Sequence, residues 1–174
     1  VESLRVSKTK DEVKYKANID IPQFWGYLKL QNEERRVVSP ELYNLAKALA
    51  KSLVTHEFTC EIFKGDVIYQ PVIIWEDGRF KSKLDLIKVD KKNKTLTPYD
   101  LKTTAFPIRE FRNQFYKLRY YIQASMYMDA AREWAFKNYP GYELKPFQFI
   151  VVSRSNPKSP AIFATNELLY LSGK

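Results

Sequence analysis

The feature that most constrains the fold is a series of three strand-like segments followed by one long helical segment. The strand-like segments are residues 66–75, 79–89 and 95–102. Short turns with the sequences "EDG" and "DKKNK" join them, and turns of this length connect antiparallel neighbours. Helical spacing over residues 117–138 ends before "PG", a common signal for helix termination. The order predicts three antiparallel strands that lead into a long helix.

Further elements are predicted on both sides of this series. Apolar and polar residues alternate over residues 13–21, which predicts a strand, and residues 24–30 can continue the sheet. The tripeptide "SPE" at residues 39–41 favours a helix start, because it supplies a hydroxyl cap, a proline and an acid, and the helix is expected to run to about His56. Later strands are predicted at "PFQFIVVS" and "PAIFAT". These elements predict the α/β class with a mixed sheet.

Length and composition are typical of one soluble globular domain. The 174 residues are 45% hydrophobic and 28% charged, enough for a real core. We expect residues 1–174 to form a single domain, trimmed at both ends. The sequence contains no apolar run of about 18 residues, so we expect no membrane span. The single cysteine, Cys60, excludes an internal disulfide, and we expect a cytoplasmic location.

The charge balance points towards a polyanionic partner. Lysine and arginine outnumber aspartate and glutamate by 29 to 20, which gives a formal net charge of +9. Nucleic acid is favoured over a membrane surface, because no basic amphipathic helix of the membrane-binding kind is present. Solvated charged faces explain the same excess equally well, and charge alone leaves both interpretations open.

Two aspartates and one lysine occur in the strands that flank the lysine-rich turn. Side chains two residues apart on a strand share a face, so Asp100 and Lys102 project together. If the two strands pair, Asp85 can converge on Asp100. Carboxylates with a backbone carbonyl, which Leu101 can supply, are typical ligands of Mg²⁺ or Mn²⁺. Such a site can activate water at a phosphodiester, with Lys102 orienting the water or neutralising a phosphate oxygen. A solvated Asp–Lys salt bridge is the alternative.

The long helix adds a second polar pattern. Gln123 and Tyr127 are four residues apart, which places them on one helical face. Their amide and phenol groups could hydrogen-bond to DNA or to the residues of the site. Taken alone, the same pattern is also typical of an ordinary amphipathic helix with polar residues at its border.

Together these motifs resemble the PD-(D/E)XK nuclease superfamily. The pattern is an aspartate at a strand end, a turn, "DLKTT", and then a helix with Gln-x-x-x-Tyr. It is most similar to the RecB-type exonucleases, and among them to the exodeoxyribonuclease VIII (RecE-like) and phage exonuclease group. The similarity covers roughly residues 56–127 and extends loosely to the late strands. It implies a restriction-endonuclease-like core, in which a mixed central sheet is flanked by helices.

The resemblance implies roles for individual residues. Asp85 matches the first motif aspartate, with Leu84 in place of the name-giving proline, while Asp100 and Lys102 match the second acid and the motif lysine. The implied catalytic set is Asp85, Asp100, Lys102, Gln123 and Tyr127. The implied metal ligands are Asp85, Asp100, the carbonyl of Leu101 and His56.

Two of these assignments have competing interpretations. His56 is the only histidine and matches the helix histidine of this branch, but it is equally explained as a surface residue beside Glu57. Some relatives carry a glutamate before the first aspartate, where this chain has Gln70, with Glu61 as an alternative acid. The departure puts a second metal in doubt more than the first.

Four basic residues near the site are candidate contacts to nucleic acid. Lys81 and Lys83 share the predicted strand face of Asp85, and the phosphate role competes with a role as solvated strand lysines. Arg109 and Arg112 lie in the segment "FPIREFRNQFYKLRYY", where cations alternate with aromatic rings. We expect most of these rings to pack into the core and the two arginines to contact DNA.

The leading hypothesis is a Mg²⁺- or Mn²⁺-dependent DNA exonuclease that acts on DNA ends in recombination, repair or phage DNA metabolism. The alternatives are a non-catalytic DNA-binding module on the same fold, and a structure- or site-specific endonuclease. DNA is the expected partner and a membrane is not. The resemblance also implies assembly as a homo-oligomeric ring or with a recombination partner protein. No Walker-type loop is present, so we do not expect ATP hydrolysis.

Overall fold

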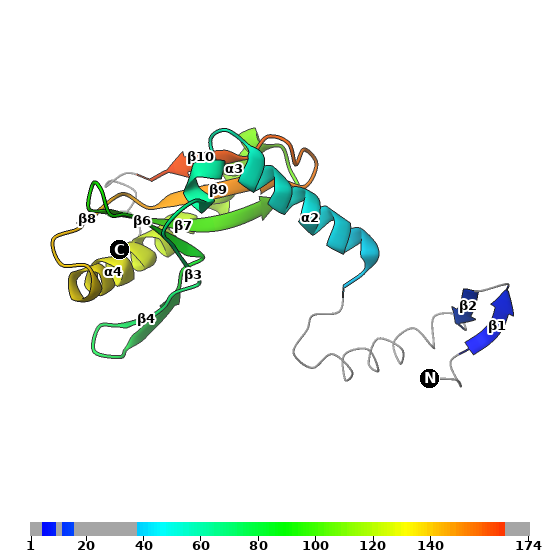
Figure 1. The fold of residues 1–174 in the computed structure, drawn as a ribbon, viewed down its shortest axis with the longest axis horizontal. Helices are drawn as coiled ribbons and strands as arrows, with labels where there is room; N and C mark the ends of the chain where they lie inside the picture. Colours follow the sequence, from blue (N-terminus) through cyan, green and yellow to red (C-terminus); the bar gives the residue numbers. More distant parts are fainter. Residues whose placement is uncertain (1–4, 10–11, 16–37, 166–174) are drawn as a thin grey trace. The chain divides into compact units, whose positions relative to one another are not determined.

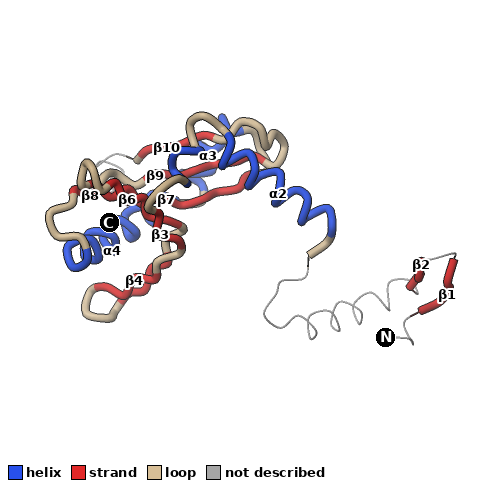
Figure 2. The backbone as a smooth tube through the Cα atoms, in the orientation of Figure 1, coloured by secondary structure: helices blue, strands red, loops and turns tan. Residues whose placement is uncertain are grey.

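The computed structural model describes residues 5–9, 12–15 and 38–165 of the chain (Figure 2). These residues belong to two compact units, residues 1–44 and 45–174, and the division falls inside one helix. In the first unit β1 (Arg5–Thr9) pairs with β2 (Glu12–Tyr15) as an antiparallel hairpin. The predicted strand over residues 13–21 therefore overlaps β2 only at its start. Its remainder and residues 24–30 lie outside the described residues.

A mixed sheet forms the centre of the second unit. Its strands follow one another in space in the order β10-β9-β7-β6-β3, with β8 beside β7. The strands are β3 (Val67–Tyr69), β6 (Leu86–Asp90), β7 (Thr95–Thr104), β8 (Glu143–Leu144), β9 (Gln148–Ser153) and β10 (Ala161–Ala164). β7 pairs antiparallel with β6 and parallel with β9, so it is the strand at which the direction changes. The α/β class and the mixed sheet are confirmed (Figure 1).

The predicted strands over residues 66–75 and 79–89 are wrong as continuous elements. Each is divided, and the inner halves β4 (Val72–Trp75) and β5 (Phe80–Lys83) form a separate two-stranded sheet. The break between β3 and β4 falls at Gln70, whose φ of 49° is left-handed, and at Pro71, which has no N–H to donate to a ladder. Gln70 N–H donates instead to the carbonyl of Asp85 at 2.8 Å. The interruption between β3 and β4 therefore lies next to the interruption between β5 and β6.

The helix in which the division between the two units falls follows the prediction closely. α2 (Pro40–Thr55) begins at Pro40, and the Ser39 hydroxyl accepts the N–H of Leu42 at 3.3 Å. The helix is followed by the short η2 (Cys60–Phe63).

The later helical region differs from the predicted single helix over residues 117–138. A short η3 (Ile108–Glu110) precedes two helices, α3 (Phe111–Lys117) and α4 (Tyr120–Asn138). Arg119 separates α3 from α4, because its φ of 54° is incompatible with a continuous right-handed helix. The predicted helix end before the Pro-Gly pair is confirmed.

The central sheet is covered on both faces by helices. Alternate residues of β9 point to opposite faces and are nearly all buried, as expected for a parallel strand between two layers. On one face α2 and η2 pack over β6, β7 and β9 through Leu49, Leu53, Ile62, Leu86, Tyr99, Ile150 and Val152. On the other face α3 and α4 pack through Phe111, Phe115, Ala124, Met128, Phe147, Phe149 and Val151.

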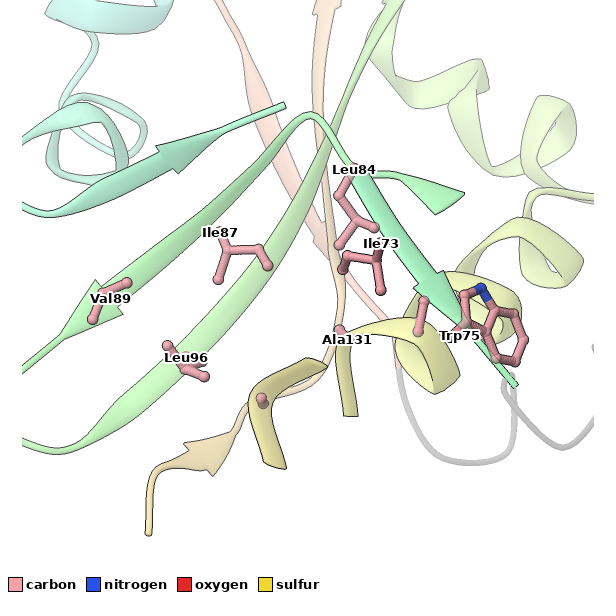
Figure 3. Packing of buried hydrophobic residues seen from close by; sticks show 9 residues of the cluster. Ile73, Trp75, Leu84, Ile87, Val89, Leu96 and Ala131 are labelled. Carbon is pink, nitrogen blue, oxygen red and sulfur yellow. The ribbon is translucent and has the colours of Figure 1, made fainter. Parts of the chain in front are cut away.

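The β4–β5 hairpin continues the core along α4 rather than along the sheet. Ile73, Trp75 and Leu84 turn inwards against the helix, next to residues of β6 and β7 (Figure 3). The indole N–H of Trp75 donates to the Ser82 hydroxyl at 3.0 Å, which satisfies the polar group inside this packing. No helix in the described part of the chain is long and apolar enough to cross a membrane.

Candidate active site

The candidate site lies where β7 extends past the start of β6. The first pair between these strands is Leu86 with Tyr99, so β7 beyond Tyr99 keeps a strand neighbour only on the β9 side. Asp100 and Lys102 occupy this extension. The split of the neighbouring strands therefore opens the sheet at the point where the sequence predicted a carboxylate and an ammonium group.

Asp85 occupies the gap left by β6. It lies in the bend between β5 and β6, and its carboxylate oxygen Oδ2 accepts the backbone N–H of Leu101 at 2.7 Å. The carboxylate thus takes the place of a ladder partner on this side of β7. The predicted convergence of Asp85 on Asp100 is present, although a bend positions Asp85 rather than a regular strand.

The carbonyl of Leu101 points to the same side as Asp85. In a strand the N–H and C=O of one residue project in the same lateral direction, and successive residues alternate. The C=O of Thr104 accepts the N–H of Arg154 at 2.8 Å. The backbone N–H and C=O groups of the even-numbered residues in this segment therefore point towards β9. The Leu101 carbonyl therefore lies on the opposite side, towards Asp85, where it is available as a ligand.

Asp100, Lys102 and Gln123 form a closed polar network between β7 and α4. The Asp100 oxygen Oδ2 lies 2.6 Å from Lys102 Nζ, and Lys102 donates to Gln123 Oε1 at 2.8 Å. The amide nitrogen of Gln123 donates back to Asp100 Oδ1 at 3.2 Å. Because the Asp100 side chain is only 6% exposed and that of Lys102 18%, the pair is held in a low-dielectric environment. Gln123 fixes both groups in position.

Burial raises the pKa of the Asp100 carboxyl above its ordinary value. The hydrogen bond and charge of Lys102 act in the opposite direction, and the nearby Asp85 carboxylate raises the pKa further. Although Lys102 is close, Asp100 Oδ2 accepts no hydrogen bond of normal geometry among the described residues. A buried carboxylate oxygen with spare lone pairs beside a second carboxylate is an arrangement that suits a cation.

The donor set fits one hard divalent cation. The described residues contain no cluster of three or more histidine, cysteine, aspartate or glutamate side chains that could hold a metal. Asp85, Asp100 and the Leu101 carbonyl supply three oxygen donors from two side chains and the backbone. Mg²⁺ keeps several waters and needs only one or two carboxylates, so this smaller set is compatible with Mg²⁺ or Mn²⁺.

Tyr120 is a site residue that the sequence reasoning missed. Its ring lies under Lys102, with the ammonium nitrogen 4.6 Å from the ring centroid, and the Phe149 ring lies 5.8 Å away. Tyr120 precedes Gln123 by three residues and thus shares its helical face. The three-residue spacing between Tyr120 and Gln123 was visible in the sequence. Because the helix was predicted to start at residue 117, Tyr120 was not distinguished from the other residues of its first turn.

Tyr127 lies one turn beyond Gln123 and belongs mainly to the core. Its half-buried ring packs edge-on against Phe147, with the centroids 5.9 Å apart. Among the described residues no hydrogen bond connects the Tyr127 hydroxyl to Asp85, Asp100 or Lys102. Its predicted direct role remains a prediction.

His56 lies just after α2 and is oriented as a donor. Its Nδ1 accepts the backbone N–H of Phe58 at 3.4 Å, so the neutral ring carries its proton on Nε2. In that tautomer neither nitrogen offers a free lone pair to a metal. Among the described residues, His56 does not form a three-residue metal cluster with Asp85 and Asp100.

Neither candidate for an additional acid contributes a carboxylate to the site. Gln70 lies between β3 and β4, beside Asp85, but it contacts Asp85 through its backbone N–H, which donates to the Asp85 carbonyl. Glu61 forms an exposed ion pair with Lys64 at 2.6 Å. The carboxylates found together at the site are therefore Asp85 and Asp100.

The predicted nucleic-acid contacts are on the surface in two different places. Lys81 and Lys83 are exposed on β5, but the bend after Lys83 means that strand periodicity no longer relates them to Asp85. Arg109 is exposed in η3, and its Nε lies 3.8 Å from Oε1 of Glu110. Arg112, on α3, is exposed beside an aromatic pocket that includes Phe111. Of the rings expected mostly to pack into the core, Phe111 and Phe115 are buried, whereas Phe106 is 59% exposed.

Comparisons with known proteins agree with this architecture. A family profile described as "PDDEXK-like domain of unknown function (DUF3799)" matches residues 6–172. Among solved structures, a "Putative exonuclease" from Eubacterium rectale aligns at 15% identity with a TM-score of 0.57, covering 88% of this chain and 59% of that chain. The present chain thus spans less than two thirds of that protein. No curated protein matches the sequence. The restriction-endonuclease-like fold is confirmed.

Proposed function

We propose that this chain, which belongs to the family of PDDEXK-like domains of unknown function, is a divalent-metal-dependent deoxyribonuclease. The observation that carries the proposal is the constellation of Asp85, Asp100, Lys102 and Gln123 at the split in the sheet. Two carboxylates and an ammonium group around a backbone carbonyl provide charges of both signs. A phosphodiester with a bound cation needs such a combination.

Each residue has a definite task in this mechanism. Asp85, Asp100 and the Leu101 carbonyl would hold Mg²⁺ or Mn²⁺, which when bound supplies Lewis acidity and lowers the pKa of water. Lys102 presents its ammonium group to a phosphate oxygen or orients the attacking water. Gln123 positions Lys102 and Asp100, and Tyr120 shields the lysine from solvent.

The finer assignment is an exonuclease of the RecB-type, exodeoxyribonuclease VIII-like branch, contained in residues 1–174 as one nuclease domain. The Gln-x-x-x-Tyr motif on α4 supports it, since Gln123 contacts both motif residues on β7. In this assignment DNA is the substrate, and Lys81, Lys83, Arg109 and Arg112 contact its backbone. Action in recombination, repair or phage DNA metabolism, with a ring assembly or a partner protein, belongs to the same proposal.

The test is degradation of linear and circular duplex DNA with Mg²⁺ or Mn²⁺. Wild-type protein should release nucleotides from linear DNA only, while Asp85→Ala, Asp100→Ala and Lys102→Ala should be inactive and folded. Lys92→Ala, in the exposed β6–β7 turn, is the matched control and should keep full activity. Retained cleavage by all three site variants would overturn the proposal, and cleavage of circular DNA would indicate an endonuclease.

A non-catalytic DNA-binding module is the second candidate. The glutamine at position 70, where some relatives carry a glutamate, is the observation that favours it. In that case the protein should bind DNA equally well in EDTA and should cleave neither linear nor circular DNA with any divalent cation.

A further inference from the structure

A second cleft lies between the C-terminal half of α2 and the loop that joins β9 to β10. Its volume is about 520 Å³, which is in the range of small-molecule sites. The polar side chains that line it are Lys51, Ser52, Thr55, His56 and Lys158. None of its lining residues is acidic, and none belongs to the carboxylate site on β7.

The groups in this cleft are cations and hydrogen-bond donors. Lys51 and Lys158 are exposed, and neither forms an ion pair within the described residues. The Ser52 hydroxyl is buried and has no hydrogen-bond partner there. His56 presents Nε2–H, because its Nδ1 already accepts the N–H of Phe58. Donors with unpaired positive charge select an anion, and they disfavour a metal ion.

An exposed aromatic ring accompanies these donors. The Phe58 side chain is 67% exposed, and its ring lies 5.4 Å from that of His56. An exposed aromatic ring next to a site lined by cations is the combination by which proteins bind single-stranded nucleic acid. The ring stacks on a base while the cations follow phosphates.

The position of the cleft relates it to the carboxylate site. The loop that carries Lys158 begins at Arg154, whose N–H donates to Thr104 at the end of β7. Asp100 and Lys102 face α4, while the cleft lies on the α2 side of the same strand end. A nucleic-acid strand that crosses the carboxyl ends of β7 and β9 would therefore meet both sites.

We infer that this cleft is a nucleotide subsite for single-stranded nucleic acid, with Lys51, His56 and Lys158 on a phosphate and Phe58 on a base. The inference rests on the proposed nuclease function and specifies its substrate as a strand that is unpaired at this point. The subsite holds the strand outside the bond that is cleaved. It therefore contributes to binding and takes no part in the chemistry.

The experiment is fluorescence anisotropy with a fluorescein-labelled oligothymidylate in EDTA, over a series of salt concentrations. The double variant Lys51→Gln, Lys158→Gln should lower the slope of log K against log salt by roughly 1.4, two contacts at about 0.7 each. Phe58→Ala should weaken binding by roughly 5- to 150-fold without changing that slope, since stacking releases no counterions. Lys51→Arg, Lys158→Arg should restore the wild-type slope.

Matched controls separate this subsite from general basicity. Lys91→Gln, Lys92→Gln removes the same charge from the β6–β7 turn and should leave slope and affinity unchanged. A wild-type slope for Lys51→Gln, Lys158→Gln overturns the inference, as does equal binding of the oligothymidylate by wild type and Phe58→Ala. Cleavage by wild type without these binding effects leaves the nuclease proposal intact. The binding effects without cleavage overturn the nuclease proposal alone.

Discussion

Asp100 is buried beside another carboxylate in a position that disfavours its negative charge. Desolvation raises its pKa, and Asp85 adds repulsion that Lys102 only partly offsets. A protein selected for stability alone would gain from an apolar or amide side chain here. The arrangement is explained if a cation neutralises both carboxylates when it binds. Perturbed carboxyls of this kind are typical of catalytic sites.

The raised pKa predicts how stability depends on pH in the absence of metal. The folded state binds the Asp100 proton more tightly than the unfolded state, so the free energy of unfolding falls as pH rises from about 3.8 through the folded pKa. Relative to Asp100→Asn, the wild-type protein should therefore lose stability over this range. Urea unfolding of both proteins in EDTA at several pH values measures the difference.

Asp90 provides a control of opposite sign. Its pKa is lowered by hydrogen bonds from Asn93, so wild type should gain stability relative to Asp90→Asn as pH rises. Equal pH dependence of wild type and Asp100→Asn would contradict the electrostatic account of the site.

Several site residues could be predicted from the sequence because their placement depends on local periodicity. Asp100 and Lys102 are two apart on a strand, and Gln123 is on the helix that follows. His56 could not be assigned in this way. Its tautomer depends on a hydrogen bond from Phe58 in a turn whose geometry no periodic pattern specifies.

At the scale of elements, two coincident breaks create the site. Gln70 and Pro71 end β3, and the bend at Leu84 and Asp85 separates β5 from β6. Pro71 signals the first break, since proline disfavours a continuous central strand, but the sequence pattern did not reveal the second break or that the two coincide. The tertiary packing of the hairpin on α4 determines them instead (Figure 3). The carboxylate of Asp85 takes its position from this bend.

Leu84 should be essential for holding the bend. Its side chain is fully buried, so Leu84→Ala should lower the free energy of unfolding by about 2–5 kcal/mol. Val72→Ala, on the exposed face of the same hairpin, is the control and should change it by roughly 0.5 kcal/mol or less. Urea unfolding measures both. A similar loss in the two variants would show that the hairpin does not pack through Leu84.

At the scale of the whole molecule, the fold presents different chemistry on the two sides of one strand end. The α4 side carries the carboxylates and Lys102, and the α2 side carries the cleft with Lys51 and Lys158, which form no ion pair with any described residue. Lys51 and Lys158, which contribute to the net charge of +9, thus lie together in one cleft. The sequence predicted the excess but not this distribution, because the loop after β9 meets α2 only in the folded chain.

The proposed nuclease activity depends most directly on the binding of a divalent cation by Asp85 and Asp100. Calorimetric titration of Mn²⁺ into the metal-free protein, without nucleic acid, tests this claim directly. Wild type should show saturable binding, and Asp100→Asn should lose it, while Asp90→Asn, an acid removed from the far end of β6, should bind like wild type. Binding that is equal in wild type and Asp100→Asn would contradict the account.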